Sequence, residues 1–435
     1  MNNSLQTDRS RIITSLRCPR ERYWTYEFNG TGLAPIKKRL PLVFGSAFHE
    51  AAEVFLRDSD ISNRPNAAEL WGTDLAEAAV TRSTEYLYTE FGKTAVDFDE
   101  PQTLYHAKEQ IAIAEALVRG WSATRRERFL ESFEVLEVEQ EGRALLTTHA
   151  PHVELLFRPD ALVREKATGD LYVISWKTSS TFGPWVTEKC AVDMQSMSEV
   201  YGIERIGALK MDLGAFTEVV VPAKVEGVLY LFAVKGQRRF DDYLGFKTQS
   251  TPLAYAWHRP GPTPEEDEWS WAYEYETEEF NDKTGKMKRT KLGKGWRKVA
   301  VWEHYPGGIA QWVEDTVNQR IAPRHVNMWD SIFPEMLPIS RRASDVESWR
   351  RQAIARELRI EQSAREVANA QRAGENRFAE ALDREFPQNT HSCFSFGGKC
   401  SVFDICWTES VKQDPMASGL YQIRIPNHPE KGDDE

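Results

Sequence analysis

Two polar side chains stand at the ends of neighbouring apolar stretches in the middle of the sequence. Asp160 follows "LLFRP" and Lys177 follows "LYVISW". The turn-like "EKATGD" joins the two stretches, so paired strands would bring the carboxylate and the ammonium group side by side. Carboxylate oxygens are preferred ligands of Mg²⁺ and Mn²⁺, which makes this pair the first candidate for a reactive site.

His49 is a third candidate for the same site. It lies in "LPLVFGSAFHEAAEVFLRD", residues 40–58, where Phe48, Ala51 and Phe55 recur at helical spacing. The small residues of "GSA" in this stretch permit close approach of the helix to a sheet. Taken alone, such a histidine is usually structural and an aspartate at a strand end usually forms a turn. Together with the lysine, they indicate one site.

The five cysteines are unevenly distributed along the chain. Cys393, Cys400 and Cys406 have the spacing C-x6-C-x5-C, and Cys18 lies near the start in "LRCPRERYW". Four thiolates are the number that a [4Fe–4S] cluster needs, and they could also bind zinc, although the C-x2-C pair usual in structural zinc sites is missing. The spacing alone leaves open a metal centre or unrelated buried cysteines. Cys190 stands apart.

The spacing of apolar residues, which predicts the elements that position these side chains, changes along the chain from helical to strand periodicity. Helices are predicted over 10–28, with a break near Cys18–Pro19, and over 40–58, 67–91 and 104–130. Strands follow in "FEVLEVEQEG", "HVELLFRPDALVREK" and "GDLYVISWKT", then a helix in "AVDMQSMSEVYGIERIGALK" and strands in "TEVVVPAKVEGVLYLFAVKG". This order predicts an α/β core, a small mixed sheet flanked by helices.

Two further segments have a distinctive composition. Residues 240–305 are rich in Trp, Tyr and charge and are predicted to be an insertion. Within them, the basic residues 281–298 predict either a solvated hairpin with a Gly-rich turn or an arm that tracks phosphates. Residues 343–386 predict a long charged helix that leads to the cysteines.

The overall composition is that of a globular protein, with 41% hydrophobic and 28% charged residues. The sequence has no apolar run of about 18 residues, and "MNNSLQTDRSR" lacks the apolar middle of a secretory signal. We therefore expect an intracellular, cytoplasmic protein without a membrane segment. The net charge of −11 argues against a sequence-independent nucleic-acid coat, but not against an enzyme whose acidic site binds metal.

Six motifs, in order, resemble the RecB-like branch of the PD-(D/E)XK nuclease superfamily, especially its iron–sulfur exonucleases related to CRISPR-adaptation and phage recombination nucleases. They are "CPRERYW", "GSAFHE" with its G-x3-H, "FRPDALV", "ISWKTSS", "MQSMSEVYGIE" and the C-terminal cysteine trio. The resemblance implies a restriction-endonuclease-like core. We divide the chain into a helical N-terminal region over 1–132, the nuclease core over 133–240, an insertion over 241–305, and a C-terminal helical and iron–sulfur segment over 306–435.

The resemblance also implies roles for the candidate residues. His49 and Asp160 would bind Mg²⁺ or Mn²⁺, and Lys177 would orient or activate the attacking water. Gln195 would support the lysine or a phosphate. A [4Fe–4S] cluster would join the two ends of the chain through Cys18, Cys393, Cys400 and Cys406.

Ser175 departs from this pattern, which has Asp or Glu two residues before the lysine. The site is then inactive, or Ser175 acts through its hydroxyl or a bridging water, or another carboxylate fills the space. We predict the third, with Glu199 as the replacement ligand, because it shares a helical face with Gln195 and stands where the family's Q-x3-Y has tyrosine. Glu188 is the second candidate.

Two other nearby residues are set aside on geometric grounds. Glu154 precedes Asp160 by six residues, roughly 20 Å along a strand, which is too far for a shared metal ion. Tyr201 lies six residues after Gln195 and should point elsewhere on the helix.

The predicted function is a metal-dependent DNA exonuclease that acts on single strands or duplex ends in recombination, repair or phage DNA metabolism. Recombination or replication proteins are its expected partners. The alternative is a catalytically inactive iron–sulfur DNA-binding protein on a nuclease fold. A third interpretation is a fold stabilised by zinc that has another activity. The presence of Lys177 favours the enzyme.

Overall fold

The structure is a computed structural model that describes residues 4–425 apart from internal segments. The segments left out are 38–39, 58–73, 94–100, 140, 150, 180–181, 210–223, 236–255, 272–274, 282–285, 292, 300–306, 309–310, 312–331, 336–337 and 395–398. Two hydrophobic cores lie on the two faces of a central sheet, and a third joins the ends of the chain.

The central sheet has four strands in the order β3-β6-β7-β8. β6 is antiparallel to both of its neighbours, whereas β8 runs parallel to β7. A parallel neighbour requires a crossover, and helices α8 and α9 lie in that connection. The predicted mixed sheet is therefore confirmed. The bounds are β3 Phe133–Val138, β6 Ala161–Glu165, β7 Leu171–Ser179, α8 Pro184–Ala191, α9 Met194–Leu209 and β8 Val225–Val234.

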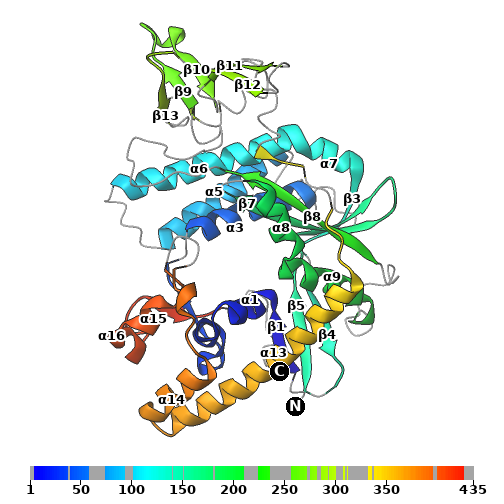
Figure 1. Ribbon diagram of the computed structural model, residues 1–435, viewed down its shortest axis with the longest axis vertical. Helices are drawn as coiled ribbons and strands as arrows, with labels where there is room; N and C mark the ends of the chain where they lie inside the picture. The colour runs from blue at the N-terminus through cyan, green and yellow to red at the C-terminus, as the bar shows by residue number, and fades with distance from the viewer. Residues whose placement is uncertain are drawn as a thin grey trace.

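Helices cover one face of this sheet (Figure 1). They are α3 Leu40–Arg57, α5 Leu75–Lys93, α6 Pro101–Trp121 and α7 Glu127–Ser132. The Trp176 ring of β7 packs among them, with its centroid 5.6 Å from that of Phe48 and 5.1 Å from that of Trp121. Because side chains alternate along a strand, Ser175 and Lys177 face the other side of the sheet.

Helix α9 and a second sheet lie on that other side. The second sheet has the order β1-β5-β4, with β1 Ser4–Asp8, β5 His152–Phe157 and β4 Gly142–Thr147. Phe157 packs so closely on Gly202 of α9 that a Cβ at this glycine would lie 2.5 Å from the ring. Neither β1 nor β4 is predicted from the sequence, and the predicted strand region "HVELLFRPDALVREK" divides into β5 and β6, which belong to different sheets.

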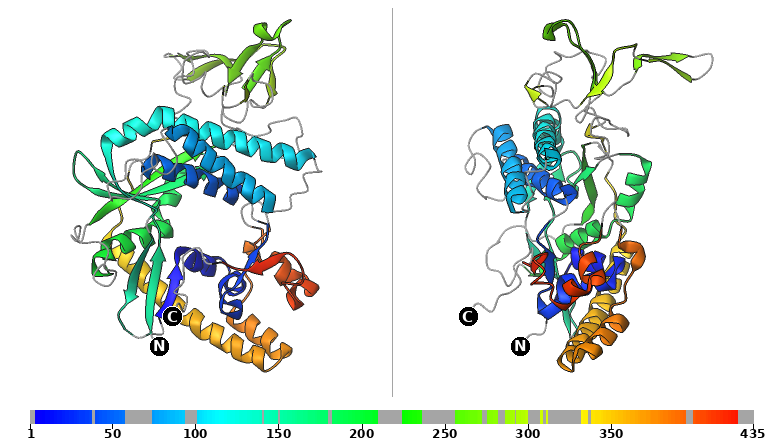
Figure 2. Two further views of the ribbon diagram at one scale, coloured as in Figure 1. Left: turned by 180° about the vertical axis from the view of Figure 1, so that it is seen from behind. Right: turned by 90° about the vertical axis from the view of Figure 1, so that its left-hand side faces the viewer.

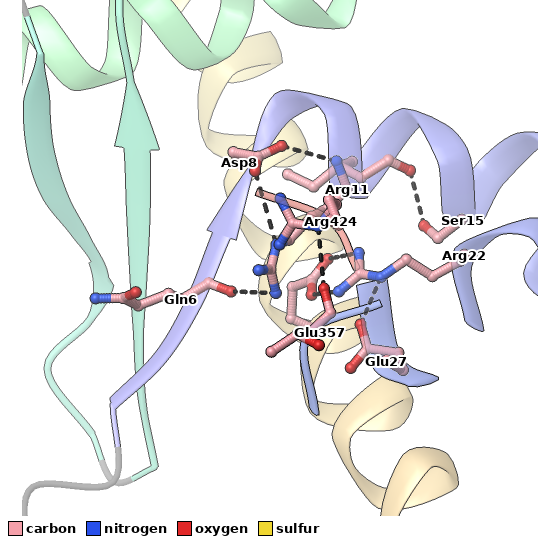
Figure 3. Close-up of polar contacts among 10 residues, drawn as sticks. Gln6, Asp8, Arg11, Ser15, Arg22, Glu27, Glu357 and Arg424 are labelled. Atoms are coloured by element: carbon pink, nitrogen blue, oxygen red, sulfur yellow. Dashed lines mark hydrogen bonds and ion pairs between the residues drawn. The ribbon is translucent and has the colours of Figure 1, made fainter. Parts of the chain in front are cut away.

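The two ends of the chain pack together (Figures 1 and 2). Helices α1 Arg9–Arg17 and α2 Pro19–Arg22 are separated at Cys18, as predicted, and contact α13 Ala343–Arg372 and α14 Glu375–Glu385. The buried Arg22 donates to both carboxylate oxygens of Glu357 on α13, at 3.1 and 2.8 Å, and to Glu27 at 2.8 Å (Figure 3). Near the C-terminus, β14 Tyr421–Ile423 pairs with β2 Leu33–Pro35.

Two predicted helices differ from those observed. The helix expected over 343–386 is interrupted by Gly374, whose φ of +119° is accessible to glycine and not to other residues without strain. It therefore forms α13 and α14, followed by the short α15 Phe403–Trp407 and α16 Glu409–Gln413. The helix expected over 67–91 begins at Leu75, and 67–73 lie outside the described residues.

The predicted insertion contains its own strands, which Figure 2 shows beyond α6. β9 Ala256–Arg259, β10 Glu268–Trp271 and β13 Arg297–Val299 form a sheet in the order β10-β9-β13. β11 Tyr275–Asn281 and β12 Lys286–Lys291 form an antiparallel hairpin. Only β12 lies within the basic segment 281–298, and its partner β11 comes from the acidic residues before it. In the part of the chain that is described, none of the helices has the length and apolar character needed to cross a bilayer.

Candidate active site

Three residues form a row across neighbouring strands of the central sheet. The register pairs the last residue of β3 with the first of β6, and the first of β6 with Ile174 of β7. Glu139, Asp160 and Ser175 therefore lie side by side, and the Glu139 N–H donates to the Asp160 carbonyl at 3.1 Å. Adjacent strands are about 4.8 Å apart, so one side chain on each flank of Asp160 can reach it.

Asp160 is held by a helix on one face of the sheet and by the backbone of the neighbouring strand. Its Oδ1 lies 3.0 Å from Nδ1 of His49 on α3, and its Oδ2 accepts from the backbone N–H of Trp176 at 2.6 Å. Burial opposes ionisation, but His49, Lys177 and the Trp176 hydrogen bond outweigh it and hold the pKa of Asp160 below its usual value. Asp160 is therefore ionised at neutral pH and can bind a cation.

Glu139 completes a group of ligand-type side chains around Asp160. The nearest ligand atoms of His49, Glu139 and Asp160 all lie within 4.8 Å of one another, the one such group found among the described residues. Burial, followed by the charge of Asp160, raises the pKa of Glu139 to about 9, and the ion pair with Arg158 at 3.0 Å offsets this only in part. Glu50 adds to the same excess of negative charge.

The donor atoms and the charges around Asp160 determine whether a divalent metal ion can bind at this group. Two carboxylates and one imidazole, a donor set suited to Mn²⁺ and acceptable to Mg²⁺, converge at the end of the sheet. A dication would offset both the burial and the repulsion from Asp160 that raise the pKa of Glu139. The His49 side chain is 32% exposed, which leaves the group open to solvent on one side. We conclude that these residues fit a divalent metal ion.

A second set of polar side chains forms a chain on the α9 side of the sheet. Lys177 Nζ donates to Gln195 Oε1 at 2.5 Å, and Gln195 Nε2 donates to Glu199 Oε1 at 2.7 Å. Burial, followed by the charge of Asp160, raises the pKa of Glu199 to about 8, although Lys177 opposes this rise. The lysine is therefore positioned by a glutamine that Glu199 holds in place.

Two buried polar atoms on this side lack a hydrogen-bond partner within the described residues. They are Oγ of Ser175 and Oε2 of Glu199, and both side chains are almost fully buried, at 1% and 4% exposure. Ser175 lies two residues before Lys177, where the resemblance noted in the sequence leads us to expect an acid. Glu199 interacts electrostatically with Asp160 but lies outside the group of three ligand-type side chains.

The remaining residues weighed from the sequence lie away from this group. Glu188 is exposed on α8, a helix separate from α9. Glu154 is on β5 in the second sheet, where Gln6 donates to it. Tyr201 donates to the Leu145 carbonyl at 2.7 Å and does not point into the site, as expected.

Glu139 is the ligand-type residue that reasoning from the sequence missed. Its position after a strand in "FEVLEVEQEG" is a weak signal, because the register of β3 with β6 depends on strands that are not consecutive along the chain. Its φ of +50° is unusual for a residue other than glycine.

The four cysteines expected at a metal centre lie around one small cavity. Cys18 comes from the break between α1 and α2, and Cys393, Cys400 and Cys406 come from the C-terminal segment. The backbone N–H of Asn389 donates to Cys18 Sγ at 3.4 Å, which ties the two segments together beside the cavity. Cys190 is buried elsewhere, between α8 and β8.

Burial and mutual repulsion favour the protonated form of two of these thiols. Burial is the main cause that raises the pKa values of Cys400 and Cys406 to about 12. The other three thiols of the group add to the rise at Cys406. The four cysteines line one cavity, but in the described part of the chain no three of them have sulfur atoms that all lie within 4.8 Å of one another.

The fold and the site together define a nuclease-like domain of the PD-(D/E)XK type. Residues 9–192 match the family model described as the PD-(D/E)XK nuclease superfamily, and these residues form a domain of that superfamily. The match contains His49, Glu139, Asp160 and Lys177 and ends before Gln195. No curated protein matches the chain.

Proposed function

We propose that this protein is a metal-dependent DNA exonuclease. The observation that carries the proposal is the convergence of His49 and Asp160 with Lys177 at one end of the central sheet of a PD-(D/E)XK domain. Phosphodiester hydrolysis needs positive charge around the phosphate and a positioned water molecule. The substrate we propose is a DNA end or a single strand, in recombination, repair or phage DNA metabolism in the cytoplasm, with recombination or replication proteins as partners.

Each residue of the site has a distinct role in this proposal. His49 and Asp160 would hold Mg²⁺ or Mn²⁺, and the ion would lower the pKa of a bound water and neutralise phosphate charge. Lys177 orients the attacking water, and its ammonium group is held in place by Gln195. Glu199 fixes the Gln195 amide and so acts as a positioning residue. Ser175 offers one hydroxyl beside Asp160.

Activity on end-labelled DNA tests this proposal. We expect the wild type to degrade single-stranded or duplex DNA with Mn²⁺ or Mg²⁺, and Lys177→Ala to lose at least about 100-fold in rate. Lys224→Ala is the matched control, because that lysine is 76% exposed and lies at the other end of the sheet. Equal activity of Lys177→Ala and the wild type would refute the assigned role.

A [4Fe–4S] cluster is the second part of the proposal. The convergence of four thiols from both ends of the chain supports it, and such a cluster would stabilise the junction of α2 with the C-terminal segment. We expect iron and sulfide in the anaerobically purified protein, lost in Cys18→Ser and kept in Cys190→Ser. Zinc without iron in a colourless protein would replace this proposal with a structural zinc site.

One observation favours a second function. Ser175 stands where an acid is expected, and its hydroxyl has no hydrogen-bond partner among the described residues. If the absence of this acid prevented metal binding, the protein would bind DNA without cleaving it. Retained DNA binding, with no cleavage by the wild type in either metal, would support this alternative.

A further inference from the structure

The missing acid of β7 has a counterpart on the opposite flank of Asp160. In the row of three neighbouring strands, Ser175 lies on one side of Asp160 and Glu139 on the other. We propose that Glu139, at the end of β3, supplies the metal ligand that Ser175 does not. This inference rests on the proposed function, because it concerns the same metal site.

Distances and contacts favour Glu139 over Glu199. Glu139 has a carboxylate oxygen within 4.8 Å of ligand atoms of both His49 and Asp160. Glu199 approaches from the α9 side, and one of its oxygens accepts the Gln195 amide at 2.7 Å. The Gln195 bond holds Glu199 in the chain that positions Lys177, so the two glutamates have different tasks.

The surroundings of Glu139 also point to a cation. Its side chain is 17% exposed, and Arg158, its ion-pair partner, is 43% exposed and can move into solvent when a metal ion binds. Arg158 contacts Oε2 of Glu139 at 3.0 Å, and a metal ion would compete with this ion pair for the carboxylate. The backbone bond from Glu139 to the Asp160 carbonyl keeps the two carboxylates together without metal.

The Ser175 flank adds no ligand-type side chain to the group of His49, Glu139 and Asp160. Ser175 Oγ and Glu199 Oε2 are both buried without a hydrogen-bond partner in the described part of the chain. A serine hydroxyl is a weak, neutral ligand, and nothing on this flank adds a charged oxygen within the group of three. A metal ion bound by His49 and Asp160 therefore finds its third protein ligand on the β3 flank.

Direct measurement of Mn²⁺ binding without DNA tests the inference. Calorimetric titration of the full-length protein is expected to show Mn²⁺ binding weakened at least about 10-fold in Glu139→Gln. Glu199→Gln should bind within about 3-fold of the wild type. Arg158→Gln is the control for the lost ion pair and should bind as well as the wild type or better. Circular dichroism and thermal unfolding establish that each variant is folded.

Moving the acid back to β7 makes the test stricter. In the Glu139→Gln background, Ser175→Asp should restore Mn²⁺ binding if the two flanks of Asp160 are interchangeable. Weakened binding in Glu199→Gln, together with unchanged binding in Glu139→Gln, would overturn the inference and leave the proposed function intact. Failure of the wild type to bind Mn²⁺ at all would overturn the metal-dependent function itself.

Discussion

Lys235 is a partly buried cation without a carboxylate partner in the described part of the chain. It directly follows β8, and its Nζ lies 4.1 Å from the centroid of the Phe44 ring on α3. Its backbone N–H donates to the Ser179 carbonyl at 2.8 Å, which holds it at the end of β7. Burial lowers the pKa of Lys235 from 10.5 to about 8.

This lowered pKa corresponds to a destabilisation of the folded state. Each pH unit of displacement is worth about 1.4 kcal/mol, so the displacement corresponds to roughly 3 kcal/mol at pH 7. The cation–π contact of Lys235 with Phe44 stabilises the folded state by about 0.5–1 kcal/mol, and Lys235→Met loses it. The side chain also retains some contact with solvent. We therefore expect Lys235→Met to raise the free energy of unfolding by about 1–2 kcal/mol at pH 7.

The gain should depend on pH in a defined direction. A lysine whose folded pKa lies below its unfolded pKa binds fewer protons in the folded state, so the wild type gains stability as pH rises from about 8 to 10.5. Below pH 8 the destabilisation is complete, and above pH 10.5 it vanishes. The difference between Lys235→Met and the wild type should shrink across this window.

Urea unfolding at pH 7, 8.5 and 10 measures this difference. Lys224→Met is the control, because that side chain is 76% exposed and its replacement relieves no burial of charge. The reasoning is wrong if Lys235→Met is no more stable than the wild type at pH 7, or if its gain is the same at pH 10.

Two further predictions concern buried contacts, one an ion pair and the other a close packing contact. Glu357→Gln leaves the buried Arg22 without its main counter-charge and should lower the free energy of unfolding by about 3–5 kcal/mol, measured in urea; a loss below 1 kcal/mol would contradict a buried pair. Gly202→Ala places a Cβ 2.5 Å from the Phe157 ring and should destabilise by about 1–3 kcal/mol in thermal unfolding. Gly92→Ala, in a helix with open space around the added methyl, should be neutral or stabilising by up to about 1 kcal/mol, and equal losses in both glycine variants would refute the packing argument.

Much of the fold can be predicted from the sequence where the signal is local. The helix over 40–58 follows from apolar residues at helical spacing, and the structure has α3 at Leu40–Arg57. The break at Cys18 follows from the proline after it, which disfavours a helical conformation in the preceding residue. The pairing of β6 with β7 follows from a short turn, which leaves few alternatives to an antiparallel hairpin.

The positions of Asp160 and Lys177 belong to the same local category. They lie on two strands joined by the turn at "EKATGD", so their proximity needs no knowledge of the rest of the fold. The face to which Gln195 and Glu199 point follows from helical spacing, and the 2.7 Å bond between them agrees with it. The sequence therefore determines the acid–lysine pair and the glutamine–glutamate pair separately.

Only the tertiary structure decided how these pairs are completed. Glu139 reaches Asp160 because β3 pairs with β6 across an intervening β4–β5 hairpin, which itself belongs to another sheet. The break at Gly374 depends on backbone torsion in a sequence that otherwise favours a continuous helix. The meeting of Cys18 with the C-terminal cysteines requires the packing of both chain ends, which buried contacts such as Arg22 with Glu357 stabilise. Periodicity and turn residues specify neighbours along the chain, whereas contacts between distant segments depend on the packing of the whole molecule.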